Sequence, residues 1–143
     1  MSLTIPNAYR FQNETRHHQD LINCEQQVLA LKAGESTVVE INALCSERND
    51  GSPSETDTFS LQGPANPSIS RLCNWLQAHK LFDNTAQQAM WCFTDDSPIE
   101  NIFDTHPDTA IENQLVALVA SEKGFVIPKR FQAPVRILRY AIE

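Results

Sequence analysis

The sequence has few glycines and no glycine-rich loop, since only four glycines occur in its 143 residues. Loops that cradle phosphate groups need several glycines at close spacing, so a nucleotide site of that kind is excluded. The G-x-S-x-G segment of serine hydrolases and the H-E-x-x-H segment of zinc peptidases are also absent. We therefore do not expect an enzyme of ordinary turnover.

Clustered basic residues and long apolar runs are missing as well. The net charge is −7 and the isoelectric point is near 5.0. Apolar residues interrupt the densest basic stretch, which contains Lys129, Arg130, Arg136 and Arg139. Phosphate binding requires grouped Lys and Arg, so we expect no nucleic-acid partner. No apolar run approaches the length that spans a bilayer, so we expect no membrane insertion.

No C-x-x-C pair occurs among the four cysteines, Cys24, Cys45, Cys73 and Cys92. This absence weakens a zinc or thioredoxin-like interpretation. Two disulfides are arithmetically possible, and the sequence leaves open whether any cysteines pair. A chain of this length can bury its own core without such bonds.

The order of patterns predicts an α+β fold, with helices packed on a mainly antiparallel sheet. We expect a single domain over residues 1–143, with a long internal loop over residues 46–66 that leaves room for a short strand at residues 58–61. The predicted strands lie near residues 21–31, 37–45 and 133–142, and the last should return to pair with the first ones. The predicted helices span residues 67–79, 85–94, 98–103 and 109–123.

Two patterns carry most of this prediction. Residues 37–45 alternate, which places Val39, Ile41, Ala43 and Cys45 on one inward face of a strand. The predicted helices show capping signals: Asn66 precedes Pro67 at the start of the first, and Thr109 and Glu112 can form a capping box in the last.

The segment A-Q-Q-A-M-W, residues 86–91, is similar to the T/A-Q-x-A-φ-W segment of bacterial surface thioester domains, also called TQXA domains. The similarity extends into F-T-D at Phe93–Asp95. In that family the equivalent of Gln87 forms a thioester with an upstream cysteine at a strand end. The segment A-L-C-S-E makes Cys45 the nearest equivalent here, and Cys24 is the second choice.

The resemblance implies an adhesion module that acylates an amine of a protein or glycoprotein partner in a single turnover, without a cofactor. Trp91 and Met90 would cover the bond and exclude water. Such a module would belong to a longer secreted or surface protein, and Met1–Leu3 looks like a leader joined to an excised domain. The oligomeric state stays open.

Two other interpretations compete with this one. In the first, the same scaffold serves non-covalent binding or structure, with Cys45 as a core residue and Gln87 and Gln88 facing solvent. In the second, a metal-dependent enzyme uses a site drawn from His17, His18, Cys24 and His106. Adjacent strand residues chelate one ion poorly, and Asp95-Asp96 and the polar segment over residues 47–55 lack the spacing of a carboxylate-pair or calcium site. We therefore expect no metal.

Overall fold

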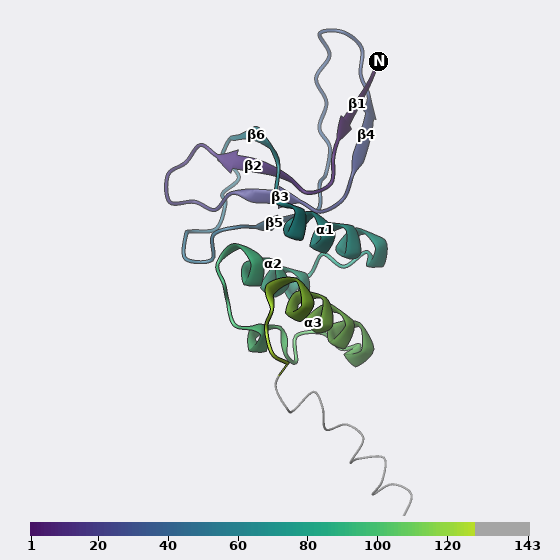
Figure 1. Cartoon of the computed structure of the whole chain (residues 1–143). Coiled ribbons are helices and arrows are strands. Elements are labelled where there is room, and N and C mark those ends of the chain that lie inside the picture. Colours follow the sequence, from purple (N-terminus) through teal and green to yellow (C-terminus); the bar gives the residue numbers. More distant parts are fainter. Residues whose placement is uncertain (128–143) are drawn as a thin grey trace, which may run out of the picture.

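The computed structural model describes residues 1–127 and shows an α+β fold, in which antiparallel strands precede a group of helices (Figure 1). The strands are β1 (Ser2–Ile5), β2 (Tyr9–Asn13), β3 (Leu21–Asn23), β4 (Gln27–Ala30), β5 (Ala43–Cys45) and β6 (Phe59–Pro64). The helices are α1 (Pro67–His79), α2 (Asn84–Thr94), the short 3₁₀ helix η1 (Ile99–Ile102) and α3 (Thr109–Lys123).

The strands form two separate antiparallel sheets. The larger sheet has the order β5-β3-β2-β6, and its pairs include Ile22 with Leu44. The smaller sheet is a ribbon of β1 and β4, which stands away from the helices (Figure 1). Leu3 and Val28 on this ribbon are mostly exposed. The larger sheet is therefore the one that contributes to the core.

The helices begin at polar caps that satisfy their first backbone N–H groups. The Asn66 side chain accepts from Ile69 N at the start of α1, as predicted. In α3 the prediction of a capping box is wrong. Asp108 caps the helix, while Glu112 is buried and accepts from the N–H groups of residues 105 and 106.

One core lies between the larger sheet and the helices. Its side chains come from β3, β5 and all three α-helices, and the largest that are fully buried include Ile22, Leu72, Leu76, Met90, Leu115 and Val119. Each of these residues is worth about 1.5–3 kcal/mol of burial. This core fixes α2 beside β5, which positions the site described below.

The structure confirms the α+β class and corrects the element list. There are three α-helices in the described residues, because the predicted helix over residues 98–103 is a 3₁₀ helix of four residues, Ile99–Ile102. The predicted strand over residues 37–45 is reduced to Ala43–Cys45, because β3 offers only three residues to pair with it. The predicted strand over residues 133–142, with its return to the first strands, lies outside the described residues.

One further expectation needs correction. Leu44 is the buried residue of β5, so Cys45 is not at the inward end of the strand but half-buried beside α2. Within the predicted loop over residues 46–66, the short strand expected at residues 58–61 is present as β6 (Phe59–Pro64), which pairs with β2. Ser2 and Leu3 belong to β1 and pair with β4.

Candidate functional site

The side chain of Gln87 pairs with the backbone of Cys45. The Cys45 N–H donates to Gln87 Oε1 at 2.9 Å, and Gln87 Nε2 donates to the Cys45 carbonyl oxygen at 2.9 Å. The two residues are 42 positions apart in the sequence. The structure thus brings together the cysteine and the glutamine that the sequence pairs as candidates.

The pairing occurs at a free edge of the larger sheet. β5 is an edge strand, and the Ser46 N–H donates toward β3, to the Asp20 carbonyl, at 3.1 Å. Backbone groups alternate in direction along a strand, so the N–H and C=O of the preceding Cys45 point outward. The Gln87 amide occupies the place that another strand would take.

Helix α2 reaches this edge because small residues line its buried face. Ala86 and Ala89 flank the two glutamines and are fully buried. The Asp83 side chain caps the helix by accepting from Ala86 N at 3.2 Å, and the Gln87 N–H donates to the Asp83 carbonyl at 3.0 Å. Gln87 therefore lies in the first turn, with its own backbone group satisfied.

The two adjacent glutamines have different surroundings. The amide of Gln88 donates to Asn84 Oδ1 at 3.2 Å, which is a pairing along the helix surface. Only the amide of Gln87 is bonded to Cys45. The expectation that both glutamines face solvent is thus wrong for Gln87.

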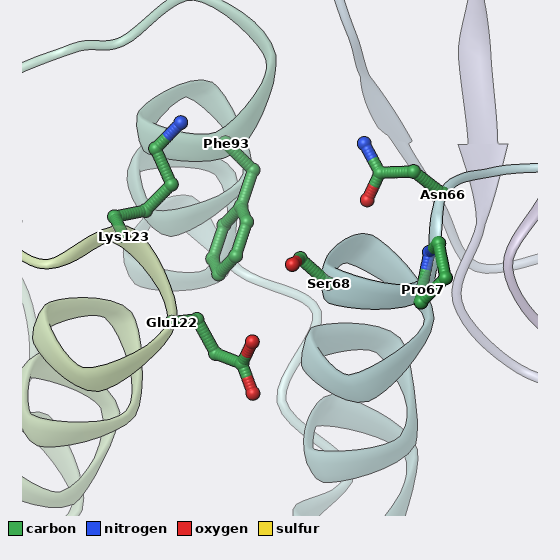
Figure 2. A pocket seen from close by; sticks show the side chains of 6 residues that line it. All are labelled: Asn66, Pro67, Ser68, Phe93, Glu122 and Lys123. Carbon is green, nitrogen blue, oxygen red and sulfur yellow. The ribbon is translucent and has the colours of Figure 1, made fainter.

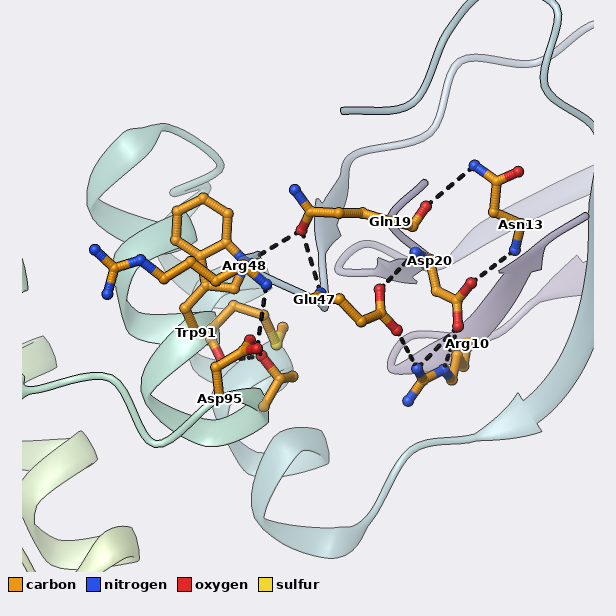
Figure 3. A network of polar contacts seen from close by, with 10 residues as sticks. Arg10, Asn13, Gln19, Asp20, Glu47, Arg48, Trp91 and Asp95 are labelled. Atoms are coloured by element: carbon orange, nitrogen blue, oxygen red, sulfur yellow. Dashed lines mark hydrogen bonds and ion pairs between the residues drawn. The ribbon is translucent and has the colours of Figure 1, made fainter. Parts of the chain in front are cut away.

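Trp91 lies one turn after Gln87, and residues four apart share a helix face. Its indole Nε1 donates to Gln19 Oε1 at 3.3 Å (Figure 3). The Arg48 guanidinium lies 6.0 Å from the Trp91 ring centroid, within the range of a cation–π contact. These contacts hold the ring beside the segment that follows β5. Met90, in contrast, is fully buried in the core.

The residues after Cys45 are fixed by a polar network that the sequence did not predict. Gln19 is buried, and its Oε1 also accepts from the Glu47 N–H at 3.2 Å. The Arg48 N–H donates to Asp95 Oδ1 at 3.2 Å, which ties the same segment to the end of α2 (Figure 3). The chain that leaves Cys45 is therefore held from both sides.

Glu47 also belongs to an ion-pair cluster with Arg10 and Asp20. Arg10 Nη2 lies 2.9 Å from Asp20 Oδ2 and 2.5 Å from Glu47 Oε1, and the Asp20 N–H donates to Glu47 Oε2 at 2.6 Å. Burial opposes charge on Asp20, but hydrogen bonds from Asn13 and Arg10 outweigh it and lower its pKa. Burial raises the pKa of Glu47.

The thiol of Cys45 is a weaker acid than an ordinary cysteine. Burial raises its pKa, and the charge of Glu47 raises it further. Only a thiolate is strongly nucleophilic, so the reactivity of Cys45 should increase with pH. The Gln87 amide is polarised by the hydrogen bond from the Cys45 N–H, which makes its carbon more electrophilic.

We expect Glu47→Gln to lower the pKa of Cys45, because the substitution removes the nearby negative charge and leaves the burial unchanged. After methylamine treatment, which leaves the Cys45 thiol free, the rate of its alkylation by iodoacetamide should then rise at lower pH than in the unsubstituted chain treated in the same way. The labelling of a Cys45→Ala variant measures the reaction of the other cysteines and is subtracted from the total. A pH profile that does not move would show that burial alone sets the pKa.

Cys24, the second-choice thiol, lies elsewhere in the core. It is fully buried, and its Sγ is 3.7 Å from Cys73 Sγ and 3.5 Å from the Ile22 carbonyl oxygen. The Cys24 sulfur thus contacts another cysteine and the sheet backbone. Cys45 is the thiol beside Gln87.

The histidines considered for a metal site have separate partners. His18 Nδ1 lies 2.8 Å from Asp57 Oδ2, and His106 Nδ1 accepts from the Asp108 N–H at 2.9 Å. Asp57 also accepts from Asn13, and these bonds lower its pKa. Within residues 1–127 no group of three or more His, Cys, Asp or Glu residues is placed to hold a metal ion.

A pocket of about 370 Å³ lies between the start of α1 and the ends of α2 and α3 (Figure 2). It is lined by Asn66, Pro67, Ser68, Phe93, Glu122 and Lys123. Its charged groups already have partners: Glu122 is paired with Arg71 and Lys123 with Asp96. None of its lining residues belongs to the Cys45–Gln87 pair.

No family model, curated protein or solved structure matches this chain. Across the part of the chain that the structure describes, no helix has both the length and the apolar character needed to cross a membrane. The geometry around Cys45 and Gln87 is therefore the basis on which a function can be proposed.

Proposed function

We propose that the chain is a thioester-domain-like surface adhesion module, in which Cys45 and Gln87 form an intramolecular thioester that acylates a partner amine. The observation that carries the proposal is the pair of 2.9 Å hydrogen bonds between the Gln87 amide and the Cys45 backbone. The Cys45 Sγ is only three bonds from its own N and C atoms. The hydrogen bonds therefore hold the amide carbon beside the residue whose sulfur would attack it.

The chemistry has two balanced steps. In the first, Cys45 Sγ attacks the Gln87 side-chain carbon, the C–N bond breaks, and the thiol proton leaves with the nitrogen as ammonia. In the second, a partner amine attacks the same carbon, the C–S bond breaks, and the sulfur takes up a proton to restore the thiol. The product is a stable amide between Gln87 and the partner.

The hydrogen bonds suit the first step. The Cys45 N–H already donates to Gln87 Oε1, so it is placed to stabilise the negative charge that develops on this oxygen during attack. The Cys45 carbonyl holds the amide nitrogen that must leave. Fixed orientation of the two reacting groups supplies a large part of the advantage in intramolecular reactions.

Intact mass of the purified full chain tests the proposal. A thioester makes the chain lighter by one ammonia than its sequence mass. Methylamine should then add its full mass to the thioester form, with the label on Gln87 and one newly reactive thiol at Cys45. A sequence mass without loss of ammonia, and no methylamine uptake, would overturn the covalent proposal.

A second candidate function is a non-covalent binding or structural domain on the same scaffold. The observation that favours it is that the Gln87 amide satisfies both outward backbone groups of Cys45, as a neighbouring strand would. In this case Gln87 protects a sheet edge and needs no reaction. The mass measurement separates the two candidates.

Gln87→Ala should destabilise the fold relative to a chain in which Gln87 keeps its side-chain amide. The substitution removes two hydrogen bonds and leaves a half-buried N–H and C=O of β5 without their partner, which costs about 1–3 kcal/mol. Urea denaturation measures the change. The matched control is Gln88→Ala, which loses only a surface pairing with Asn84 and should cost no more than about 0.5 kcal/mol. Equal effects of the two substitutions would contradict the edge-pairing role.

A further inference from the structure

Two cysteines that the proposed function does not use lie side by side in the core. Cys24 Sγ and Cys73 Sγ are 3.7 Å apart, and both residues are fully buried. Cys24 directly follows β3, and Cys73 lies in the middle of α1. The pair therefore bridges the larger sheet and a helix that are distant in the sequence.

The two sulfurs are in van der Waals contact but are not bonded. A disulfide has an S–S length of about 2.05 Å, so the two atoms need to approach by only about 1.7 Å. Small rotations of the two side chains supply such a shift. The backbone on both sides is well held, since the Cys24 N–H donates to the Asn42 carbonyl at 2.8 Å and the neighbouring Leu72 and Leu76 of α1 are fully buried.

We propose that Cys24 and Cys73 form a structural disulfide that joins the larger sheet to helix α1 when the chain folds in the presence of a disulfide oxidant. The other two cysteines are placed differently. Cys45 faces Gln87, and Cys92 Sγ donates to the Pro98 carbonyl at 3.8 Å. The sequence allows several pairings, and the positions of the sulfurs select this one.

The reaction is a balanced thiol–disulfide exchange. One cysteine thiolate attacks a small disulfide such as oxidised glutathione, which releases one reduced glutathione and leaves a mixed disulfide. The second cysteine thiolate then attacks the sulfur of the first cysteine and releases the second reduced glutathione. Two cysteine thiols are oxidised and one glutathione disulfide is reduced.

Burial determines when this exchange occurs. Neither sulfur is exposed in the folded chain, so an oxidant reaches them only during folding or local opening. The hydrogen bond with Cys73 and burial both raise the pKa of Cys24, which keeps the Cys24 thiol protonated and unreactive in the folded chain. The bond should therefore form during folding and persist in an oxidising compartment.

The test uses the full chain with Cys45→Ala, because this variant cannot form the proposed thioester and its outcome is independent of that proposal. The protein is denatured, refolded with reduced and oxidised glutathione, and alkylated with N-ethylmaleimide in denaturant. Three cysteines remain in this variant. We expect one label before reduction, three after reduction, and a cross-linked peptide that contains Cys24 and Cys73.

The bond should also stabilise the fold by restricting the unfolded chain, because it closes a loop with a sequence separation of 49 residues. We expect the midpoint of thermal unfolding to rise by about 10 °C relative to the reduced protein. Adding Cys73→Val should leave Cys24 and Cys92 reactive and remove the redox effect on the midpoint, whereas adding Cys92→Ala should preserve both the bridge and the shift. Three reactive thiols before reduction, or a bridge that includes Cys92, would overturn the proposal.

Discussion

Cys45→Ser is expected to abolish both the loss of ammonia and the uptake of a labelled primary amine. The reason is chemical, because a serine hydroxyl at neutral pH is a far weaker nucleophile than a cysteine thiolate. The fold should be preserved, since both hydrogen bonds from Gln87 reach backbone atoms of residue 45, which the substitution leaves in place. Intact mass and fluorescence of an incorporated amine measure the first effect.

The stability of Cys45→Ser should be compared with that of the native chain after methylamine treatment, in which any thioester between Cys45 and Gln87 has been opened. Against this reference, Cys45→Ser should change the unfolding midpoint by no more than about 2 °C. A variant that still takes up amine would show that another thiol, such as Cys24, is the nucleophile. A variant that unfolds at a much lower temperature would show that the Cys45 side chain itself carries structure.

Met90→Ala should have the largest effect on stability. Met90 is fully buried in helix α2, in the same core cluster as Ile22 and Leu115. Removing most of its side chain leaves a cavity, and substitutions of this kind cost about 2–5 kcal/mol. Urea denaturation, monitored by tryptophan fluorescence, measures the change in the free energy of unfolding.

The conservative control is Met90→Leu, which keeps the volume and should cost less than about 1.5 kcal/mol. Because Met90 packs in the core, the alanine variant should still react with amine wherever it remains folded. Selective loss of the reaction in a well-folded Met90→Ala protein would instead support the expectation that Met90 covers the bond.

The helices were predictable because their signals are local. Asn66 and Pro67 are adjacent at the start of α1, and Gly124 takes a positive φ of 71° at the end of α3, so caps and periodicity lie within each segment. The capping box at Thr109 was wrong because two residues compete there. Asp108 is one position earlier and takes the capping role, which frees Glu112 for the backbone of residues 105 and 106.

The strands were harder to predict because their partners are distant in the sequence. Apolar and polar residues alternate over residues 37–42, which is typical of a strand. β3, however, has only three residues and pairs with Ala43–Cys45 alone, so residues 37–42 have no strand partner in the described part of the chain. β1 was missed because Ser2 and Leu3 carry little pattern of their own. Their strand conformation depends on pairing with Ala30 and Leu29 of β4.

In the candidate site, too, residues with a local sequence signal could be predicted and residues that act through distant contacts could not. The segment at residues 86–91 and Cys45 at the end of β5 could be found in the sequence, through the family resemblance. Gln19, Glu47 and Arg48 could not, because each acts through a contact with a backbone group or ring far along the chain. Polar residues of this kind carry no periodic or spacing signal, so only the folded arrangement reveals them.

The position of the Gln87 amide at the edge of β5 has a consequence for self-association. An open strand edge invites another chain to add to the sheet, and here a side chain blocks that addition at Cys45. Release of ammonia would remove the Nε2 donor and leave the Cys45 carbonyl oxygen bare. The thioester form would then have an unpaired acceptor at the edge of β5, which the form with an intact Gln87 amide does not have. Formation of the thioester and binding of an extended peptide to this edge would therefore be coupled at Cys45.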